Sequence, residues 1–236
     1  MSTTSRTAVV TGGEGSIGRA LVALLLARGI RVVSADRCRS DTSPPASNGY
    51  LYEYHPYEAQ DASSAEVLVA EVGPIDYLVL AAGIYPESPL STMSDDDWHN
   101  TININLTGSY TLLQRSLPML TQDASVVLLS SIAGVRGSRH HAHYAASKAG
   151  LLGLARSAMW ELGQSRRINV VSPGIIDNAM SADLRGASGE LILTNTPLGR
   201  YGTPHEVATV LDFLCSDASA FIQGENINVN GGFYVG

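Results

Sequence analysis

The sequence predicts an α/β protein in which helices cover both faces of one parallel sheet. Three observations favour this class. Short runs rich in Val, Leu and Ile alternate with longer stretches of helical spacing along all 236 residues. These runs are nearly continuous in apolar residues, as in strands that are buried on both faces. No linker or change of composition divides the chain, so we expect one domain over residues 1–236, with an insertion at about 178–202.

Seven segments are predicted as strands because they are short, apolar and rich in β-branched residues. The five strong segments are 7–11, 31–35, 77–81, 125–130 and 168–172, and the two weaker ones are 50–54 and 227–229.

Five segments between them have helical spacing, and two of these carry start signals. Ser94 before three consecutive Asp residues is typical of an N-cap with acids in the first turn. Pro204 after Thr203 fits the first turn of a capped helix. The expected helices are 17–27, 63–72, 95–117, 144–162 and 204–214.

Composition excludes several classes of function. The 15 Lys and Arg against 22 Asp and Glu give a net charge of −7, which disfavours a nucleic-acid partner. The longest apolar run, residues 20–27, is far shorter than the roughly 20 residues that span a bilayer. Two cysteines are too few for a disulfide framework or a metal knuckle. We therefore expect a cytoplasmic protein whose partner is a small molecule, with no membrane or nucleic-acid partner.

A glycine-rich turn joins the first strand to the first helix. Glycines at positions 12, 13, 15 and 18 let the backbone turn tightly and approach a pyrophosphate, whose charge the helix N-terminus stabilises. Glycine clusters alone often mark only turns, but this one lies at a strand-to-helix junction, which is typical of dinucleotide binding.

Asp36 follows Gly18 by 18 residues and ends the second predicted strand. A carboxylate there can accept hydrogen bonds from ribose hydroxyls and repel a 2′-phosphate, and Glu14 would add to that repulsion. Arg37 and Arg39 could instead pair with a 2′-phosphate. The sequence thus favours NAD while leaving NADP possible, and the plain alternative is that Asp36 only begins a loop.

Tyr144 and Lys148 lie four residues apart, which places a phenol and an ammonium on one helix face. A nearby cation lowers the pKa of a tyrosine, ordinarily about 10, by roughly 1–3 units. Alone, this spacing most often marks a solvated helix face. Ser131, however, lies at the carboxyl end of a predicted strand, where ligands of such sheets collect. Its hydroxyl can hydrogen-bond the substrate oxygen that the tyrosine protonates.

These residues resemble the short-chain dehydrogenase/reductase family over essentially the whole chain. The matching segments are 11–18, 105–108, Ser131 with Tyr144 and Lys148, 173–174, 200–208 and 229–232. The resemblance implies a single Rossmann-like doubly wound domain with a seven-stranded parallel sheet between helix layers. It also implies hydride transfer between a nicotinamide and a substrate carbon.

Each catalytic role follows from the resemblance. Tyr144 would be the acid/base, Lys148 would lower its pKa and hold the nicotinamide ribose, Ser131 would position the substrate oxygen, and Asn105 would hold a water in a proton relay. The implied cofactor-binding residues are Gly12, Gly15, Ser16, Ile17, Gly18, Asp36, Arg37, Ala81, Ala82, Gly83, Tyr144, Lys148, Pro173, Gly174 and Ile176.

The chain departs from the family pattern at five places. The acid expected after the third strand to touch adenine is not evident, and His55 lies near that position. Ser16 replaces the middle glycine of the turn, Leu80-Ala81 replaces a pair of asparagines, Asn178 a threonine, and Asn230 an aspartate. None of these departures touches the four catalytic residues, so they bear on cofactor affinity more than on catalysis.

The expected substrate pocket includes Ala133, His141, Tyr85 and Met180. The histidines at 140, 141 and 143 raise the possibility of zinc, but no Cys or carboxylate accompanies them in the segment, so we expect no metal. The alternatives are a plain loop, or His141 facing the substrate. Residues 178–202 suggest a mobile lid with one short helix, or else a surface loop. Because the lid has few charges, a small or medium neutral substrate fits best.

Three functions remain open from the sequence. The first is an NAD(P)-dependent enzyme that interconverts a secondary alcohol and a ketone. The second is a non-catalytic dinucleotide-sensing regulator, which would not need the ammonium beside the phenol. The third is a 3-oxoacyl-carrier-protein ketoreductase, whose acidic partner needs a basic patch such as Arg136, Arg139, Arg166 and Arg167. The resemblance also implies a homotetramer or homodimer.

Overall fold

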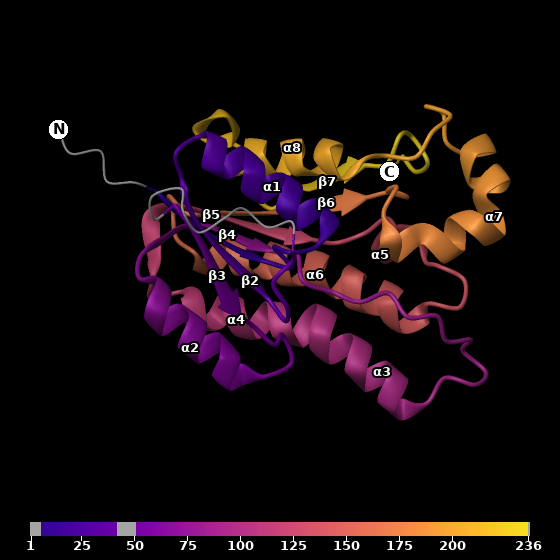
Figure 1. Cartoon of the computed structure of the whole chain (residues 1–236), viewed down its shortest axis with the longest axis horizontal. Coiled ribbons are helices and arrows are strands. Elements are labelled where there is room, and N and C mark those ends of the chain that lie inside the picture. The colour runs from indigo at the N-terminus through magenta and orange to yellow at the C-terminus, as the bar shows by residue number, and fades with distance from the viewer. Residues whose placement is uncertain (1–5, 42–50, 236) are drawn as a thin grey trace.

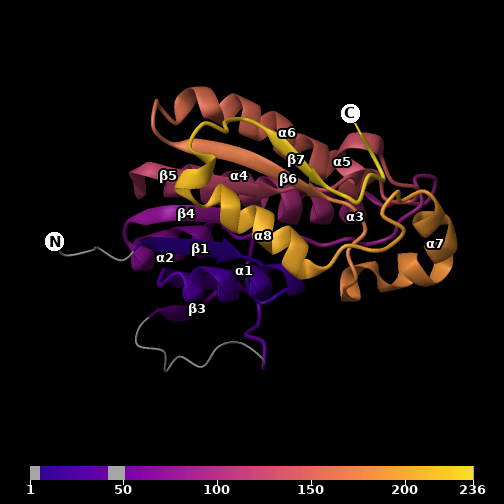
Figure 2. The same ribbon diagram turned by 90° about the horizontal axis from the view of Figure 1, so that it is seen from above.

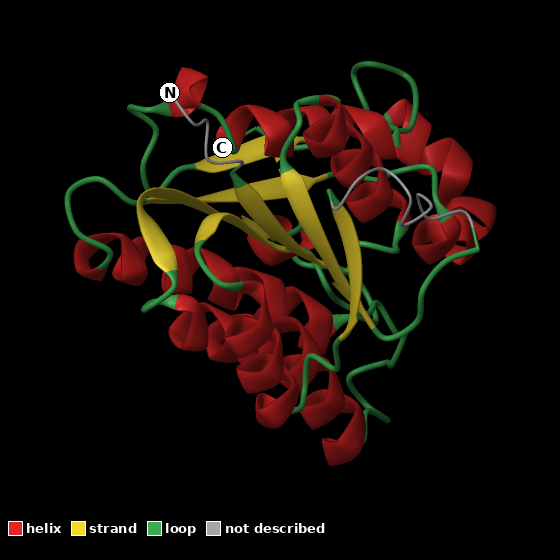
Figure 3. Cartoon of the chain, turned by 60° about the vertical axis from the view of Figure 1, so that its left-hand side comes forward, coloured by secondary structure: helices red, strands yellow, loops and turns green. Residues whose placement is uncertain are grey.

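A computed structural model describes residues 6–41 and 51–235 of the chain. Its seven strands form one parallel sheet in the order β3-β2-β1-β4-β5-β6-β7, which confirms the predicted fold class (Figures 1 and 3). The strands are β1 Thr7–Thr11, β2 Arg31–Asp36, β3 Tyr52–Pro56, β4 Ile75–Leu80, β5 Leu120–Leu129, β6 Arg167–Pro173 and β7 Asn226–Val229. The weak strand expected at 50–54 is shifted toward the C-terminus, and position 50 lies outside the described residues.

Helices cover both faces of the sheet (Figure 1). On one face α1 packs against α8, and on the other lie α2, α4 and α6. The helices are α1 Ser16–Ala27, α2 Ala62–Val72, α3 Asp95–Ile102, α4 Gly108–Ser116, α5 Ala133–Arg136, α6 Ala142–Glu161, α7 Ala182–Thr194 and α8 Pro204–Leu214. Short helical turns are η1 Asn103–Thr107, η2 Ala179–Ser181 and η3 Asp217–Ser219.

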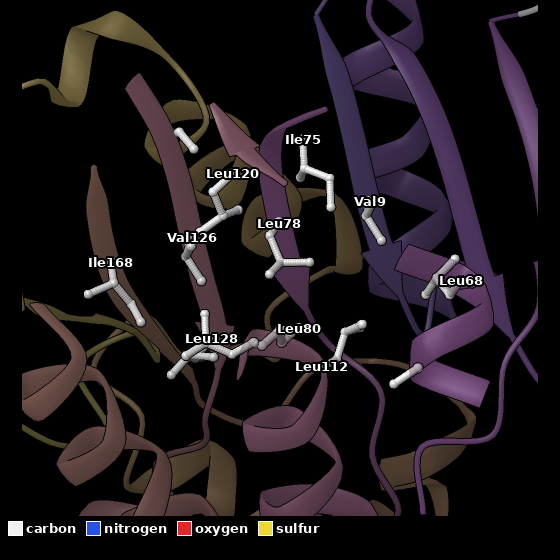
Figure 4. Close-up of a cluster of buried hydrophobic side chains, with 14 of the residues drawn as sticks. Val9, Leu68, Ile75, Leu78, Leu80, Leu112, Leu120, Val126, Leu128 and Ile168 are labelled. Atoms are coloured by element: carbon white, nitrogen blue, oxygen red, sulfur yellow. The ribbon is translucent and has the colours of Figure 1, made fainter. Parts of the chain in front are cut away.

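Two apolar clusters hold these layers together, because alternate residues of each strand point to opposite faces. Leu78 and Val126 pack against Leu68 of α2 and Leu112 of α4 in one cluster (Figure 4). Their neighbours in the strands face α1 and α8 in the other cluster. Burial on both faces explains why the strands are nearly continuous in apolar residues.

The expected single helix over 95–117 is three helical segments. α3 passes into the π-helical turn η1, and α4 follows it. A π-turn inserts an extra residue and redirects the side chains around it, often at a functional site. Asn105 lies in this turn and is fully buried. Spacing alone gives no signal for this irregularity, since the apolar pattern continues through it.

The predicted caps are confirmed. Ser94 accepts a hydrogen bond from the Asp97 amide at the start of α3, and Thr203 accepts one from the Glu206 amide at the start of α8. Both complete capping boxes, because the acidic side chain in turn accepts from the cap amide. Among the described helices, none is long and apolar enough to cross a membrane.

The strand order places a crevice at the carboxyl edge of the sheet. The chain leaves β1 toward β2 and β3 on one side, and continues from β4 to β7 on the other, so β1 and β4 flank a topological switch point. Figures 1 and 2 place α7 beyond the edge toward which the strand arrows point. Loops from both halves therefore converge under α7.

Candidate active site

A cavity of about 820 Å³ opens at this carboxyl edge. It brings together most residues that the sequence predicted for the site. The expected residues that line it are Gly12, Gly15, Ser16, Ile17, Gly18, Ala81, Gly83, Tyr85, Ser131, Ala133, Tyr144, Lys148, Pro173, Gly174, Ile176 and Met180. Five expected residues, Asp36, Arg37, Ala82, Asn105 and His141, do not line it.

The glycine turn fits a pyrophosphate. Gly12 has φ of 65°, and a Cβ there would lie 2.9 Å from the Ala81 backbone. A Cβ on Gly18 would collide with the carbonyl oxygen of Gly12. The first turn of α1 contains no acid, and its N-cap Gly15 provides no side-chain cap. The amides of that turn are therefore available to an anion beside the cavity.

Thr11 braces the floor of this turn, a role that the sequence reasoning missed. Its hydroxyl accepts hydrogen bonds from the amides of Ala81 at 3.0 Å and Ala82 at 3.1 Å. These contacts fix the backbone after β4, where the expected asparagine pair is absent.

Asp36 ends β2 beside the glycine turn, outside the cavity. Its carboxylate accepts hydrogen bonds from the amides of Glu14 at 3.1 Å and Arg37 at 2.8 Å. The Glu14 carboxylate accepts from Ser34, from the Ser40 amide at 2.9 Å and from the Tyr52 hydroxyl. Glu14 is therefore held beside Ser34 of β2 and Tyr52 of β3, and its repulsion of a 2′-phosphate stays a prediction.

Tyr144 and Lys148 lie together at the base of the cavity, on the first turns of α6. The Lys148 ammonium is 5.7 Å from the centre of the Tyr144 ring and donates to the Leu129 carbonyl at 2.8 Å. Both side chains are buried, at 8% and 4% exposure. Burial favours the uncharged form of each group.

The electrostatics of this pair differ from the expectation. Burial raises the pKa of Tyr144 to about 12, against a smaller lowering by its hydrogen bond with Ser131. Burial lowers the pKa of Lys148 to about 8. In the chain alone, desolvation therefore sets the direction of the tyrosine pKa shift, which is opposite to the lowering that the spacing with Lys148 predicted.

The Asn105 side chain hydrogen-bonds both to the backbone of Ile84 and to the side chain of Ser147. Its Oδ1 accepts from the Ile84 amide at 2.8 Å, while its Nδ2 donates to the Ile84 carbonyl at 3.0 Å and to the Ser147 hydroxyl at 3.1 Å. A Cβ on Gly83 would lie 3.1 Å from Asn105 Oδ1 and 3.3 Å from Lys148 Nζ. The absence of a side chain at Gly83 lets the amide and the ammonium approach the same point.

The side chains of the three histidines before Tyr144 lie in three different places. His141 is stacked on Tyr85, with ring centres 4.0 Å apart, and its Nδ1 is 2.6 Å from the Arg139 carbonyl. The rings of Tyr85 and Tyr144 in turn pack edge to face, with their centres 4.6 Å apart. Tyr85 therefore lies between the cavity and His141, so the hypothesis that His141 lines the pocket is wrong.

The other two histidines lie in different surroundings. His140 pairs with Glu87 at 2.8 Å, and His143 is fully buried, where burial lowers its pKa. Within the described ranges no group of three or more His, Cys, Asp or Glu side chains is arranged to hold a metal ion.

Residues 177–201 form a covering segment with η2 and α7. A parallel bridge between Ile176 and Gly202 joins its two ends. Arg185 of α7 ties the helix to the start of the segment. Its guanidinium lies 2.5 Å from the Asp177 carboxylate and donates to the Asn178 carbonyl at 3.0 Å. Met180 lines the cavity from η2, as do Leu184 and Ile192 from α7.

Two departures from the family pattern have local explanations. Asn178 caps η2 by accepting from the Ser181 amide at 3.1 Å, as a threonine hydroxyl would. Asn230 accepts from the Gly232 amide at 2.9 Å and donates to the Tyr234 carbonyl at 2.9 Å. The second bond needs an amide donor, which the aspartate of the family does not have.

Comparison with known proteins agrees with this geometry. Residues 12–234 match a family model described as enoyl-(acyl carrier protein) reductase. The chain is 34% identical to 3-oxoacyl-(acyl-carrier-protein) reductase FabG of Thermotoga maritima, over 96% of this chain and 97% of the relative. It is 34% identical to the FabG of Escherichia coli K12 over the full length of both.

A solved structure with a similar fold comes from Brucella melitensis. It is titled as a short-chain dehydrogenase/reductase, glucose/ribitol dehydrogenase, and superposes with a TM-score of 0.92 at 41% identity. The superposition covers 98% of this chain and 97% of that one.

Proposed function

The chain belongs to the short-chain dehydrogenase/reductase family, and on that premise we propose that it interconverts a ketone and a secondary alcohol with a nicotinamide dinucleotide. The observation that carries this proposal is the shared cavity. Ser131, Tyr144 and Lys148 line the same space as the glycine turn at the N-terminus of α1. A pure dinucleotide sensor would have no use for a phenol and an ammonium buried side by side.

The residues of the chain position the substrate and supply the proton that its oxygen receives. When bound, the dinucleotide supplies or accepts the hydride. The Ser131 hydroxyl accepts from the Ala133 amide at 3.1 Å and is hydrogen-bonded to Tyr144, and when substrate binds it would donate to the substrate oxygen instead. The Tyr144 hydroxyl donates its proton to that oxygen during reduction, and Lys148 stabilises the phenolate that forms.

The pH dependence follows from these two groups. With a pKa of about 12, Tyr144 keeps its proton near neutral pH and is ready to act as an acid. Lys148, with a pKa of about 8, is charged below that value and loses its charge above it. We expect kcat/KM for reduction to be flat near neutrality and to fall above about pH 8. A reduction profile that rises through that region would contradict this assignment.

We propose NAD as the preferred dinucleotide, because Asp36 places a carboxylate at the end of β2. Two backbone amides hold it, and carboxylate oxygens have further lone pairs that can accept from ribose hydroxyls. Asp36→Ala should shift the ratio of kcat/KM for NADH over NADPH toward NADPH by about tenfold or more. A matched control is Asp41→Ala, which removes an exposed carboxylate from the following loop. Wild-type preference for NADPH would overturn the proposal.

A second candidate is reduction of a 3-oxoacyl thioester. Relatives that this chain matches over nearly their whole length, the FabG proteins of Thermotoga maritima and Escherichia coli, are named as reductases of this kind, which favours it. A panel of ketones, methyl 3-oxo esters and a 3-oxoacyl pantetheine thioester, assayed with NADH and NADPH by dinucleotide absorbance, separates the two candidates. Activity on free ketones supports the first, and activity confined to the thioester supports the second. Dinucleotide binding without turnover of any compound would contradict both.

We also propose that the chain forms a homotetramer or homodimer. Large apolar side chains are exposed on the helical face opposite α1, at Trp98 of α3, Tyr110 of α4 and Trp160 of α6. Exposed apolar groups of this kind are typical of a surface that a partner covers. Light scattering behind size-exclusion chromatography gives the mass directly, and a monomer at micromolar concentration would contradict this proposal.

A further inference from the structure

We propose that the substrate is a ketone or alcohol that carries a carboxylate, bound at the cavity wall by Arg136 and Arg139. This inference rests on the proposed function, because it assigns the substrate class of the same site. Both arginines follow Ser131 closely in the chain, on α5 and the turn after it, and both line the cavity that contains Tyr144.

The cavity is positive although the protein is acidic overall. Four cationic side chains line it, Arg19, Arg136, Arg139 and Lys148, and a single carboxylate, Asp177, does so in the described chain. Asp177 is already neutralised by Arg185, at 2.5 Å. The chain as a whole has a net charge of −7. Concentrated positive charge in a concave site draws anions to it.

Of these four cations, Lys148 has a place in the proposed function, and Arg19 belongs to the helix that begins at the glycine turn. Arg19 lies in the first turns of α1, beside the glycine turn, and Lys148 is buried under Tyr144. Arg136 and Arg139 have no such task. Six other arginines pair with carboxylates within the described residues, whereas neither of these two does so there.

Arg136 is also held in a defined orientation. Its guanidinium carbon lies 4.5 Å from the ring centre of Phe233, which reaches the cavity from the segment after β7. Stacking on an aromatic face fixes the guanidinium plane and leaves the N–H groups at its edge available. Those donors match the two oxygens of a carboxylate.

The covering segment accommodates the carbon skeleton of such a substrate. Met180, Leu184 and Ile192 present apolar side chains to the cavity from η2 and α7. The expectation of a neutral substrate rested on the small number of charges in this segment. The cations come instead from the segment after Ser131. The expected substrate is therefore still small or medium in size, but it is negatively charged and not neutral.

The test compares keto acids with their methyl esters, which share a skeleton and differ in charge. The probes are acetoacetate, levulinate and benzoylformate with the corresponding esters, assayed for reduction and, by calorimetry, for binding to the protein saturated with dinucleotide. The variants are Arg136→Gln, Arg139→Gln and the double variant. Arg156→Gln is the matched control, since Arg156 is exposed on α6 and does not line the cavity.

We expect the wild type to prefer at least one acid over its ester by about tenfold or more, as charge-assisted hydrogen bonds predict. The double variant should lose that preference while its activity on the ester stays, and Arg156→Gln should change neither. No preference for any acid, or a preference that the double variant keeps, overturns the inference while leaving the proposed function intact.

Two further results separate the inference from the proposed function. Charge-dependent binding of an acid without any reduction supports the inference and counts against the proposed function. An effect of the arginine variants that is confined to 3-oxoacyl groups attached to an acyl carrier protein overturns the inference, because the arginines then contact the carrier.

Discussion

Replacing Tyr144 with Phe is expected to reduce kcat by at least about 100-fold, the usual size of a general-acid contribution. The substitution removes one hydroxyl and keeps the ring, which touches Tyr85 at 4.6 Å and is buried at 8% exposure. The proton donor is lost and the packing is kept. The measurement is single-turnover reduction followed through dinucleotide absorbance.

The control for this variant is Tyr85→Phe. Tyr85 lines the same cavity, and its hydroxyl lies 3.3 Å from the Ser138 hydroxyl and 3.4 Å from His141 Nδ1. Its turnover should remain within a few fold of the wild type, and both variants should bind dinucleotide normally. A Tyr144→Phe protein with near-normal kcat would remove Tyr144 from the reaction.

Replacing Gly18 with Ala is expected to abolish tight dinucleotide binding. A Cβ there collides with the Gly12 carbonyl oxygen and lies 2.7 Å from the Gly13 Cα, so the glycine turn must shift. Both neighbours are backbone atoms, which cannot rotate away as a side chain can. We expect affinity to fall at least tenfold and stability to fall by about 1–3 kcal/mol, as for overpacked sites.

Gly153→Ala is the matched control for this variant. A Cβ at Gly153 meets nothing within 4 Å, and the residue lies within α6. Alanine is favoured over glycine in a helix by about 1 kcal/mol, so stability should hold or rise. Fluorescence titration with dinucleotide and denaturant unfolding measure both properties. Unchanged affinity in Gly18→Ala would show that the dinucleotide does not bind at this turn.

The sequence predicted the layers of the fold because strand burial and helix caps are local signals. Apolar runs such as β1, together with the capping residues Ser94 and Thr203, gave the element types and several of their bounds. The π-turn at Asn105 was missed, because an inserted residue leaves no mark on the apolar spacing. The short helix α5 was missed for a similar reason, as four residues are too few to show a period.

The site was predictable where chemistry depends on residue type and spacing. Tyr144, Lys148 and the glycine turn lie in one cavity, as their spacing and the sheet edge indicated. The direction in which a side chain points was less predictable. His141 stacks behind Tyr85, and Glu14 turns back to the sheet, because each finds local hydrogen-bond partners there.

The pKa of Tyr144 was not predictable from spacing, since it depends on how deeply the phenol is buried. A cation at helical spacing suggested a lower value, whereas burial raises it to about 12. The ring of Phe233 also escaped the substrate-pocket prediction, because its segment and that of Arg136 are far apart in the sequence and meet only in the fold.

Crystals of the protein soaked with dinucleotide give the most direct test of the whole account. We expect a pyrophosphate on the amides at the start of α1 and a nicotinamide ring beside the Tyr144 hydroxyl. A dinucleotide bound with its nicotinamide away from Tyr144 and Ser131, or one that leaves the glycine turn empty, would contradict it.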